Sequence, residues 1–259
     1  MAAEVLLARD GDIATVTLSN PGRLNALNLA MWKRLGEIMR ALDSDDALRC
    51  IVLTGAGDKA FAAGADIAEF RTERSDARQA KAYGEIVAGT MRAIRECRHP
   101  TLALIRGACV GGGLEIASQC DLRICGASSK FGVPIKNLGL VVAYEEMAGL
   151  IALAGRAVTL EILLEGRVFG AEEARAKGLV NRIEAEADVW REGHAAARRI
   201  ADGAPLVARW HKKFSRRLAD PRQLSTQEQD ESYACFDTED YRIGVEAFLG
   251  KRKPEFKAR

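Results

Sequence analysis

Residues 107–140 read GACVGGGLEIASQCDLRICGASSKFGVPIKNLGL, and this stretch contains the pattern that decides the fold. It follows a short apolar run at 102–106, passes through consecutive glycines at 111–113 and continues with a helical pattern as far as Cys120. A second apolar run, at 122–125, ends in a glycine. Short apolar runs that stop at glycine are typical of strands buried on both faces. The stretch therefore predicts strand, glycine turn, helix and strand.

The same order of elements appears earlier in the chain. Residues 5–7 and 13–18 alternate around a turn and predict a hairpin, and residues 27–42 carry apolar side chains at helical spacing. A third short apolar run, at 50–54, also ends in glycine, and residues 67–98 have a helical pattern. Strands, turns and helices that recur at irregular intervals predict an α/β fold with crossover connections.

The second half of the chain is mainly helical. Helical patterns begin at residues 144–155, a last short strand is expected at 180–183, and residues 186–248 form amphipathic segments broken by glycine and proline. No low-complexity linker separates this half from the first. We therefore divide the chain into an α/β core, residues 1–185, and a helical C-terminal region, residues 186–259, that packs on the core or on a neighbouring subunit.

The composition excludes several classes of protein. The chain has 259 residues, is 48% hydrophobic and has a formal net charge of +2, which excludes a disordered chain and a strongly basic nucleic-acid binder. Six cysteines without a CxxC pair and three histidines indicate neither a disulfide framework nor a metal site. The N-terminus lacks a basic signal-peptide region, and no apolar run approaches the ~18 residues of a membrane helix. We expect a cytoplasmic protein with no nucleic acid and no membrane among its partners.

Residues 55–60, GAGDKA, match the loose form of a dinucleotide-binding loop. In such a loop the glycines open a helix whose N-terminus meets the pyrophosphate. Here Asp58 adds a negative charge, and residues 61–64 separate the glycines from any helix. We therefore interpret the motif as a glycine-rich loop after a buried strand and expect no NAD.

Residues 107–111 have the form of a nucleophile elbow, with Cys109 in the position of the nucleophile. By chain order, Asp188 with His194 or His211 could complete a catalytic triad, although both histidines lie in charged helical stretches. The other interpretation is a small buried cysteine that enters a tight turn. The sequence favours the buried cysteine and leaves a Cys109 hydrolase as an alternative function from another class.

Two glycine-containing loops lead into helices. The first lies in FAAGADIAEF, residues 61–70, where Asp66 and Glu69 form a capping pattern, and the second is the glycine run that precedes Glu115. Glycine permits close approach of the backbone, and free N–H groups at the start of a helix can bind an oxyanion. Two N–H donors from two separate loops could therefore hold one carbonyl oxygen.

Together, residues 61–70 and 107–140 resemble the two signature regions of the crotonase (enoyl-CoA hydratase/isomerase) superfamily. The resemblance continues in residues 21–27, 170–180 and 238–256, and it covers essentially the whole chain. It implies a crotonase-like spiral of ββα units with a C-terminal helical trimerisation region. It also implies a homotrimer or a dimer of trimers.

By resemblance, the backbone N–H groups of Ala65 and Gly112 stabilise a thioester enolate, and Glu115 matches the first catalytic glutamate of the family. Glu115 lies in the first turn of its helix, where nearby N–H dipoles are expected to favour its anion. The implied substrate is an acyl-CoA thioester. No metal and no separate cofactor are implied, because coenzyme A is part of the substrate.

The sequence departs from the family pattern at Ile135. Typical hydratases carry a second glutamate after Phe-Gly-x-Pro, and Ile135 can neither donate nor accept a proton. Hydration normally uses one carboxylate for the water and one for the Cα proton, so fast hydration of crotonyl-CoA is in doubt. Tyr144, Glu145 and Glu146 follow, and we expect them at an ordinary solvated helix start. The alternative is that one of them reaches the pocket, where Glu145 or Glu146 could assist Glu115 in hydration.

The favoured function is an enoyl-CoA hydratase, a lyase, in which Glu115 is the one glutamate that matches the family. Isomerisation of a double bond needs only one carboxylate and remains an alternative. Decarboxylation of a malonyl-type thioester needs no base, although Glu115 would repel the substrate carboxylate. A non-catalytic CoA-binding protein, in which turnover was lost with the second glutamate, is a further alternative from another class.

The resemblance also implies the residues that contact CoA or the acyl group. Two of them come from the C-terminal region, in some members from an adjacent subunit, and acyl-chain selectivity is expected on residues 70–98. The implied contact residues are Arg23, Ala63, Ala65, Asp66, Ile67, Gly112, Ile135, Phe248 and Lys251.

Overall fold

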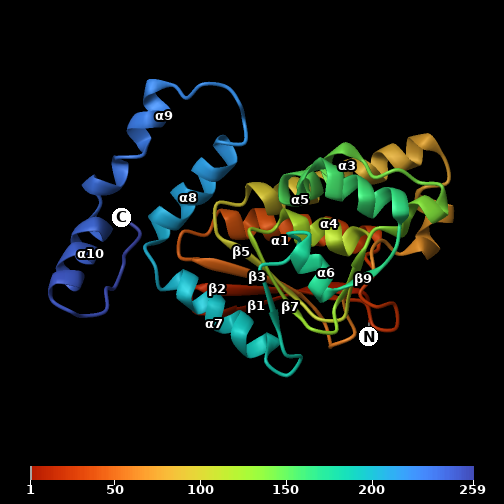
Figure 1. The fold of residues 1–259 in the computed structure, drawn as a ribbon, viewed down its shortest axis with the longest axis horizontal. Coiled ribbons are helices and arrows are strands. Elements are labelled where there is room, and N and C mark those ends of the chain that lie inside the picture. Colours follow the sequence, from red (N-terminus) through yellow and green to blue (C-terminus); the bar gives the residue numbers. More distant parts are fainter. Residues whose placement is uncertain (1) are drawn as a thin grey trace.

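The computed structural model describes residues 2–259 and folds them into two β-sheets surrounded by helices (Figure 1). The chain begins with the predicted hairpin, β1 (Glu4–Asp10) and β2 (Ile13–Ser19), which pair antiparallel. Gly11 takes φ +58° in the turn between them, a conformation in which glycine has no steric penalty. The expected hairpin is confirmed.

The larger sheet has six strands in the order β1-β2-β3-β5-β7-β10. Beyond the hairpin, its strands run parallel. The three predicted buried strands are among them, as is the last short strand. Their bounds are β3 (Cys50–Gly55), β5 (Thr101–Ile105), β7 (Leu122–Gly126) and β10 (Arg182–Glu184).

The smaller sheet has the order β4-β6-β8-β9, and the sequence patterns did not reveal it. Its strands have two or three residues each: β4 (Ala60–Ala62), β6 (Ala108–Val110), β8 (Lys130–Gly132) and β9 (Phe169–Gly170). Each of β3, β5 and β7 in the larger sheet is followed along the chain by one strand of the smaller sheet. This repeated step from one sheet to the other forms the expected spiral of ββα units.

Helices complete each turn of the spiral, and the first shows why they form. In α1 (Leu29–Asp43), the side chain of Asn28 accepts a hydrogen bond from Met31 N–H at 2.8 Å, and one face of the helix is buried. The expected helix at 67–98 is broken into three parts. The other core helices are η1 (Ile67–Glu69), α2 (Phe70–Glu73), α3 (Ala77–Glu96), α4 (Gly112–Gln119), η2 (Pro134–Leu138), α5 (Tyr144–Glu165) and α6 (Ala171–Ala176).

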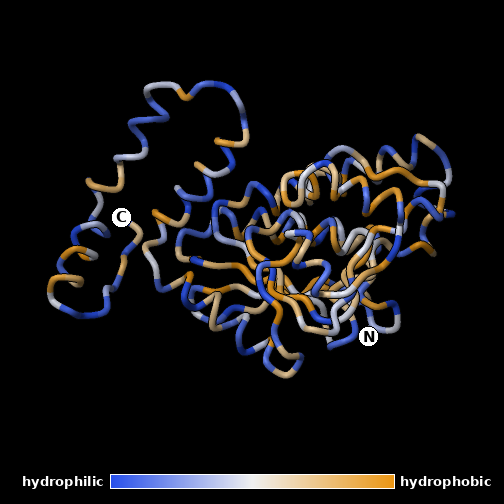
Figure 2. Tube along the Cα trace, in the orientation of Figure 1, coloured by the Kyte–Doolittle hydropathy of each residue, from blue (hydrophilic) through white to orange (hydrophobic). Residues whose placement is uncertain are grey.

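The larger sheet is covered on both faces. The main apolar core lies between this sheet, the smaller sheet and α1, α3 and α4, and it includes Trp32, Phe61 and Phe131. A second cluster packs α7 (Val189–Ala201) against the other face. Gly193 of α7 lies so close to β5 that a Cβ there would come within 2.3 Å of Leu104 Cδ1. Figure 2 shows the apolar residues concentrated in this layered body.

The helices after α7 form an arm that extends away from the layered body (Figure 1). The arm consists of α8 (Pro205–Arg217), α9 (Thr226–Glu231), η3 (Ala234–Asp237) and α10 (Glu239–Leu249). A buried contact ties it to the core, because Lys212 of α8 donates to His99 O at 2.9 Å and pairs with Asp121 at 2.7 Å. The boundary at residue 185 stays a prediction.

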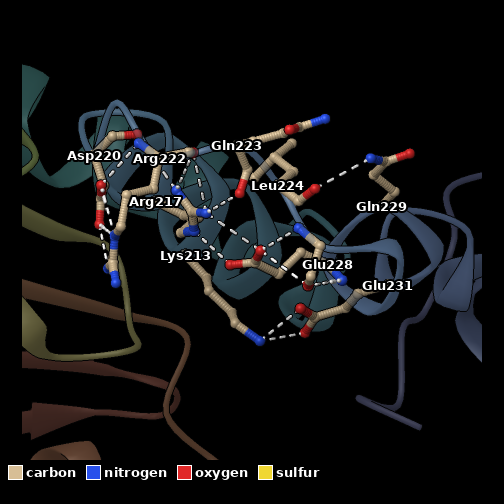
Figure 3. Close-up of polar contacts among 10 residues, drawn as sticks. Lys213, Arg217, Asp220, Arg222, Gln223, Leu224, Glu228, Gln229 and Glu231 are labelled. Atoms are coloured by element: carbon tan, nitrogen blue, oxygen red, sulfur yellow. Dashed lines mark hydrogen bonds and ion pairs between the residues drawn. The ribbon is translucent and has the colours of Figure 1, made fainter.

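Ion pairs set the turn between α8 and α9 (Figure 3). Arg217 of α8 donates to Glu228 Oε2 of α9 at 3.2 Å, and Lys213 donates to Glu231 Oε2 at 2.6 Å. Between the two helices, Arg222 Nε donates to Asp220 Oδ2 at 2.8 Å. The turn is therefore held by charges, while apolar side chains of the arm, such as Leu218 and Phe248, remain exposed in the single chain.

The helix α5 is long and apolar. Among the described residues, it has the length and composition of a membrane-crossing helix, which is weak evidence for a membrane span, and the expectation of no membrane partner stays a prediction. Arg156 and Glu161 interrupt its apolar run without making the helix polar overall. The helix bends at Gly155, where φ is +77°, and packs against α3 and α4 of the core.

Candidate active site

A cavity of about 270 Å³ lies where the two glycine loops meet α3, α4 and the start of α5. Glu115 and Gly112 of α4, predicted as functional residues, line it together with Ala63, Ala65 and Ile67 of the first loop. Its wall also contains aromatic and aliphatic side chains, including Trp32, Phe70, Tyr83 and Val87. An apolar pocket with a few polar groups is the usual form of a ligand site.

The first loop is held against residues 24–27 by the backbone. Ala63 N–H donates to Leu24 O at 3.0 Å, Leu27 N–H donates to Gly64 O at 2.8 Å and Asp66 N–H donates to Leu27 O at 2.8 Å. Ala65 N–H has no such acceptor among the described residues. The hydrogen bonds around Ala65 therefore fix the loop and leave the Ala65 N–H available to a ligand.

The second loop presents Gly112 N–H at the start of α4. The first N–H groups of a helix have no partner within the helix, and Gly112 N–H has no acceptor among the described residues. A Cβ on Gly64, where φ is +103°, would lie 3.3 Å from Gly112 N, so the two loops are in close contact. Ala65 and Gly112 therefore bring two unpaired N–H donors to one cavity, as the sequence predicted.

Glycine at position 113 permits this close approach. A Cβ there would lie 2.1 Å from the carbonyl oxygen of Ala62 in β4, which is far closer than side-chain and backbone atoms come. Gly113 thus lets α4 pack directly on the strand that leads into the first loop. The glycine run therefore allows the close packing that sets the distance between the N–H groups of Ala65 and Gly112.

Glu115 is buried, with 5% of its surface exposed, and its side chain lines the cavity. Burial and, to a smaller extent, the charge of the nearby Glu146 raise its pKa to about 8, although Arg74 opposes this rise. The expectation that Glu115 is held as the anion is therefore wrong. Burial favours the neutral form, so the carboxyl group is mainly protonated at neutral pH.

The structure corrects the expectation for Glu146, which lines the same cavity as Glu115 instead of lying in solvent at an ordinary helix start. Tyr144 is 95% exposed, as expected. Glu145 points to α3, where it pairs with Arg95 at 2.9 Å and Arg92 at 3.1 Å. Ile135 also lines the cavity, so an apolar residue is present where the family pattern has its second glutamate.

The capping pattern in the first loop is partly as expected. The side chain of Asp66 accepts from Ala68 N–H at 3.1 Å and therefore caps η1. Glu69 does not complete the box, because its Oε2 accepts instead from Leu29 N–H at 2.8 Å, at the start of α1. Glu69 thus joins the first loop to the start of α1.

The expected CoA contacts divide into two groups. Arg23 lies beside the first loop and pairs with Asp66 at 3.6 Å, with most of the Arg23 side chain exposed. The side chains of Phe248 and Lys251 belong to the arm, and neither lines the cavity of the same chain. Phe248 is 84% exposed. The roles of these residues in CoA binding stay predictions.

The nucleophile interpretation of Cys109 is wrong. Cys109 lies in β6, is completely buried and does not line the cavity. Burial raises the pKa of its thiol well above the ordinary value, so the reactive thiolate is disfavoured. His194 lies on the exposed side of α7, with its ring against Trp190, and therefore cannot serve Cys109. The expected elbow is a strand of the smaller sheet.

Trp32 was missed in the sequence, and Arg74, Tyr83 and Val87 were covered only by the general expectation for residues 70–98. Trp32, Tyr83 and Val87 follow helical periodicity, and this pattern is the same for a core side chain and for one that faces a cavity. Arg74 is stacked on Phe70 and Tyr83, with its Cζ 4.5 Å and 4.8 Å from the ring centroids. This cation lies between two segments of the expected helix, a break that the pattern did not reveal.

A larger cavity, of about 930 Å³, lies between α8 and α9, but its chemistry differs. Lys213, Arg217, Glu228 and Glu231 line it and already pair with one another. Nothing in it resembles the unpaired donors and the buried carboxyl group beside the glycine loops. Among residues 2–259, no cluster of three or more His, Cys, Asp or Glu side chains could hold a metal ion.

Comparison with known proteins gives a consistent result. The family model for enoyl-CoA hydratase/isomerase matches residues 8–259. The chain is 30% identical to a short-chain-enoyl-CoA hydratase of Clostridium acetobutylicum, over 97% of this chain and 96% of the relative. It is 35% identical to a probable enoyl-CoA hydratase of Rhizobium meliloti, over the full length of both.

Solved structures agree with these relatives. An enoyl-CoA hydratase/carnithine racemase from Magnetospirillum magneticum is 50% identical, with a TM-score of 0.97 over 100% of this chain and 97% of the other. An enoyl-CoA hydratase from Bacillus anthracis is 26% identical, with a TM-score of 0.90 over 98% of this chain and 99% of the other. The similarity therefore extends over the arm as well as the layered body.

Proposed function

Since this chain belongs to the enoyl-CoA hydratase/isomerase family, we propose that its cavity binds an acyl-CoA thioester and stabilises the enolate of that thioester. The N–H groups of Ala65 and Gly112 donate to the thioester oxygen, and Glu115 exchanges a proton with the acyl group. The observation that carries this proposal is the presence of two unpaired N–H donors and a buried carboxyl group in one cavity.

The physical reason for this arrangement is the weak acidity of a proton next to a thioester. Negative charge develops on the thioester oxygen as that proton leaves, or as water adds to the double bond. Each preorganised N–H donor stabilises this charge by roughly 3 kcal/mol. No donor has to be turned toward the oxygen during the reaction, because hydrogen bonds around Ala65 and the start of α4 already fix both.

Hydration of an enoyl-CoA is the reaction that the cavity supports best. Decarboxylation of a malonyl-type thioester is disfavoured, because the Glu146 charge at the cavity would oppose a second anionic group there. Isomerisation of a double bond would use the same N–H donors and the same Glu115 carboxyl group, and its product should be sought in the same assay. The reaction needs no cofactor apart from the CoA of the substrate.

The arm supports a proposal about assembly. In the single chain, α10 and its surroundings expose large apolar side chains, including Phe236, Phe248 and Leu249, and such surfaces mark contacts with other chains. We therefore expect a homotrimer or a dimer of trimers, in which Phe248 and Lys251 approach CoA bound to an adjacent subunit. A cytoplasmic location stays a prediction.

A panel of acyl-CoA esters analysed by mass spectrometry tests the proposed function. The full-length protein should add one water to an enoyl-CoA, and Glu115→Gln should lower this rate by about 100-fold or more, as expected for loss of a general acid or base. Full activity of Glu115→Gln would contradict the role of Glu115. Binding of CoA esters without any turnover would show a binding protein instead.

A further inference from the structure

Two carboxyl groups face one cavity, and the chain segments that carry them are far apart in sequence. Glu115 lies on the first turn of α4, and Glu146 lies on the first turn of α5, which packs along α4. Both line the cavity, which also contains the two free N–H donors. The Glu146 charge raises the pKa of Glu115, so the two groups are close enough to influence each other's charge.

Glu146 is held in a defined position. Its Oε2 accepts a hydrogen bond from Ala143 N–H at 2.8 Å, in the capping arrangement that begins α5. No other hydrogen bond or ion pair involves its side chain among the described residues, so Oε1 has no protein partner there. Glu146 is therefore fixed by the helix start and still has one oxygen for a ligand.

The neighbouring residues distinguish Glu146 from Glu145. Glu145 is paired with Arg92 and Arg95, which lower its pKa and keep it on the α3 side of the helix. The charged groups that face Glu115 are Glu146 of α5 and Arg74, which follows α2. Tyr83 of α3 also lines the cavity, and burial raises its pKa to about 12, so it remains neutral. Glu146 is thus the second carboxyl group of this cavity.

We propose that Glu146 is the second catalytic carboxylate, in the place of the glutamate that residue 135 lacks, and that it works as a pair with Glu115. This inference rests on the proposed function. Two negative charges in one apolar site repel each other, and Glu115 is the more buried of the two groups. Glu115 therefore carries a proton at neutral pH.

The pair supplies both proton transfers of hydration. Glu146 takes a proton from a bound water as the water oxygen forms a bond to Cβ of the enoyl group. The electron pair of the double bond moves toward the thioester oxygen, which the two N–H donors hold. Glu115 then gives its proton to Cα, and the extra proton returns from Glu146 to Glu115 before the next turnover. The sum is the addition of one water molecule.

The test compares Glu146→Gln with Glu145→Gln in the full-length protein. A glutamine at 146 can still accept from Ala143 N–H, so the helix start is kept, and Glu145→Gln is a matched control on the next residue. Glu146→Gln should lower hydration of crotonyl-CoA by about 100-fold or more, whereas Glu145→Gln should leave it nearly unchanged. Near-normal hydration by Glu146→Gln would overturn the inference.

A second readout separates the two carboxyl groups. Exchange of the α-protons of butyryl-CoA with D2O needs only the Glu115 carboxylate and the oxyanion donors, so Glu146→Gln should keep it. Because the Glu146 charge raises the pKa of Glu115, the midpoint of the pH profile for exchange should fall in Glu146→Gln and stay in place in Glu145→Gln. If Glu146→Gln lost exchange as well as hydration, the separate roles of Glu115 and Glu146 would be overturned.

A rescue experiment tests whether a carboxyl group at position 135 can replace the one at position 146. Ile135 lines the cavity, so Ile135→Glu in the Glu146→Gln background returns a second carboxyl group to the site. Hydration should recover at least ten-fold over Glu146→Gln alone, because acid–base pairs contribute rate factors of this order or greater. Failure of Glu115→Gln to reduce any reaction would instead refute the proposed function itself.

Discussion

The buried carboxyl group of Glu115 has a measurable effect on folding stability, which allows its environment to be tested without any substrate. Burial raises its pKa from 4.5 to about 8. In the unfolded chain the group ionises near its ordinary pKa, whereas in the folded chain it stays protonated. Folding stability from this group is therefore complete below about pH 4.5 and is lost as the pH rises toward 8.

The magnitude follows from the linkage between protons and folding. Each pKa unit corresponds to about 1.4 kcal/mol, so at pH 7, about 2.5 units above the unfolded pKa, the lost stability amounts to at most about 3.5 kcal/mol relative to acidic solution. Glu115→Gln removes the titration and keeps a similar volume. The free energy of unfolding of Glu115→Gln should therefore rise relative to the parent protein by about 2–3 kcal/mol between pH 5 and pH 7.

Urea denaturation at several pH values and one protein concentration measures this difference, since the other titrating groups are common to both proteins. Glu145→Gln is the control and should show the opposite sign. Arg95 and Arg92 lower the pKa of Glu145, so its contribution is present above its unfolded pKa, and removal costs about 0.2–1 kcal/mol at pH 7. A pH-independent difference for Glu115→Gln would refute the buried, protonated state.

Three further substitutions test the packing around the cavity. Cys109→Ser should leave hydration nearly unchanged, because Cys109 is buried in β6 away from the cavity, and a large loss of kcat would revive the hydrolase interpretation. Gly113→Ala should lower the free energy of unfolding by about 1–3 kcal/mol and reduce activity, because its Cβ would meet Ala62 O. Gly89→Ala in α3 is the control, because the space around Gly89 is open. Its stability, measured by the same thermal melting experiment, should be unchanged or higher. Val87→Ala enlarges the cavity wall and should raise kcat/KM for longer enoyl chains relative to crotonyl-CoA, and an unchanged ratio would place the acyl chain elsewhere.

Strong local patterns allowed most of the larger sheet to be predicted. The runs that became β3, β5 and β7 are apolar at nearly every residue and end at or near glycine, which is the pattern of strands covered on both faces. The smaller sheet was missed, because strands of two or three residues are too short for a periodic signal. Cys109 is an example, because its strand β6 was interpreted as the turn of a nucleophile elbow.

The site was predictable where a motif fixes the backbone and was missed where tertiary packing decides. Ala65, Gly112 and Glu115 follow from glycine loops before helices and from the family resemblance. Glu146 reaches the cavity only because α5 packs along α4, and nothing in its local sequence distinguishes it from Glu145. The pKa of Glu115 likewise depends on burial by distant segments, so the local helix position gave the wrong sign.

The most direct test of the account is the hydration rate of crotonyl-CoA in Glu115→Gln, Glu146→Gln and the double variant, followed by mass spectrometry and compared with Glu145→Gln. A shared mechanism predicts that each single substitution lowers the rate by about 100-fold or more and that the double variant is little worse than either one, because two groups that act as a unit are not additive. Normal hydration by either Glu115→Gln or Glu146→Gln would contradict a pair of carboxyl groups that supplies both proton transfers.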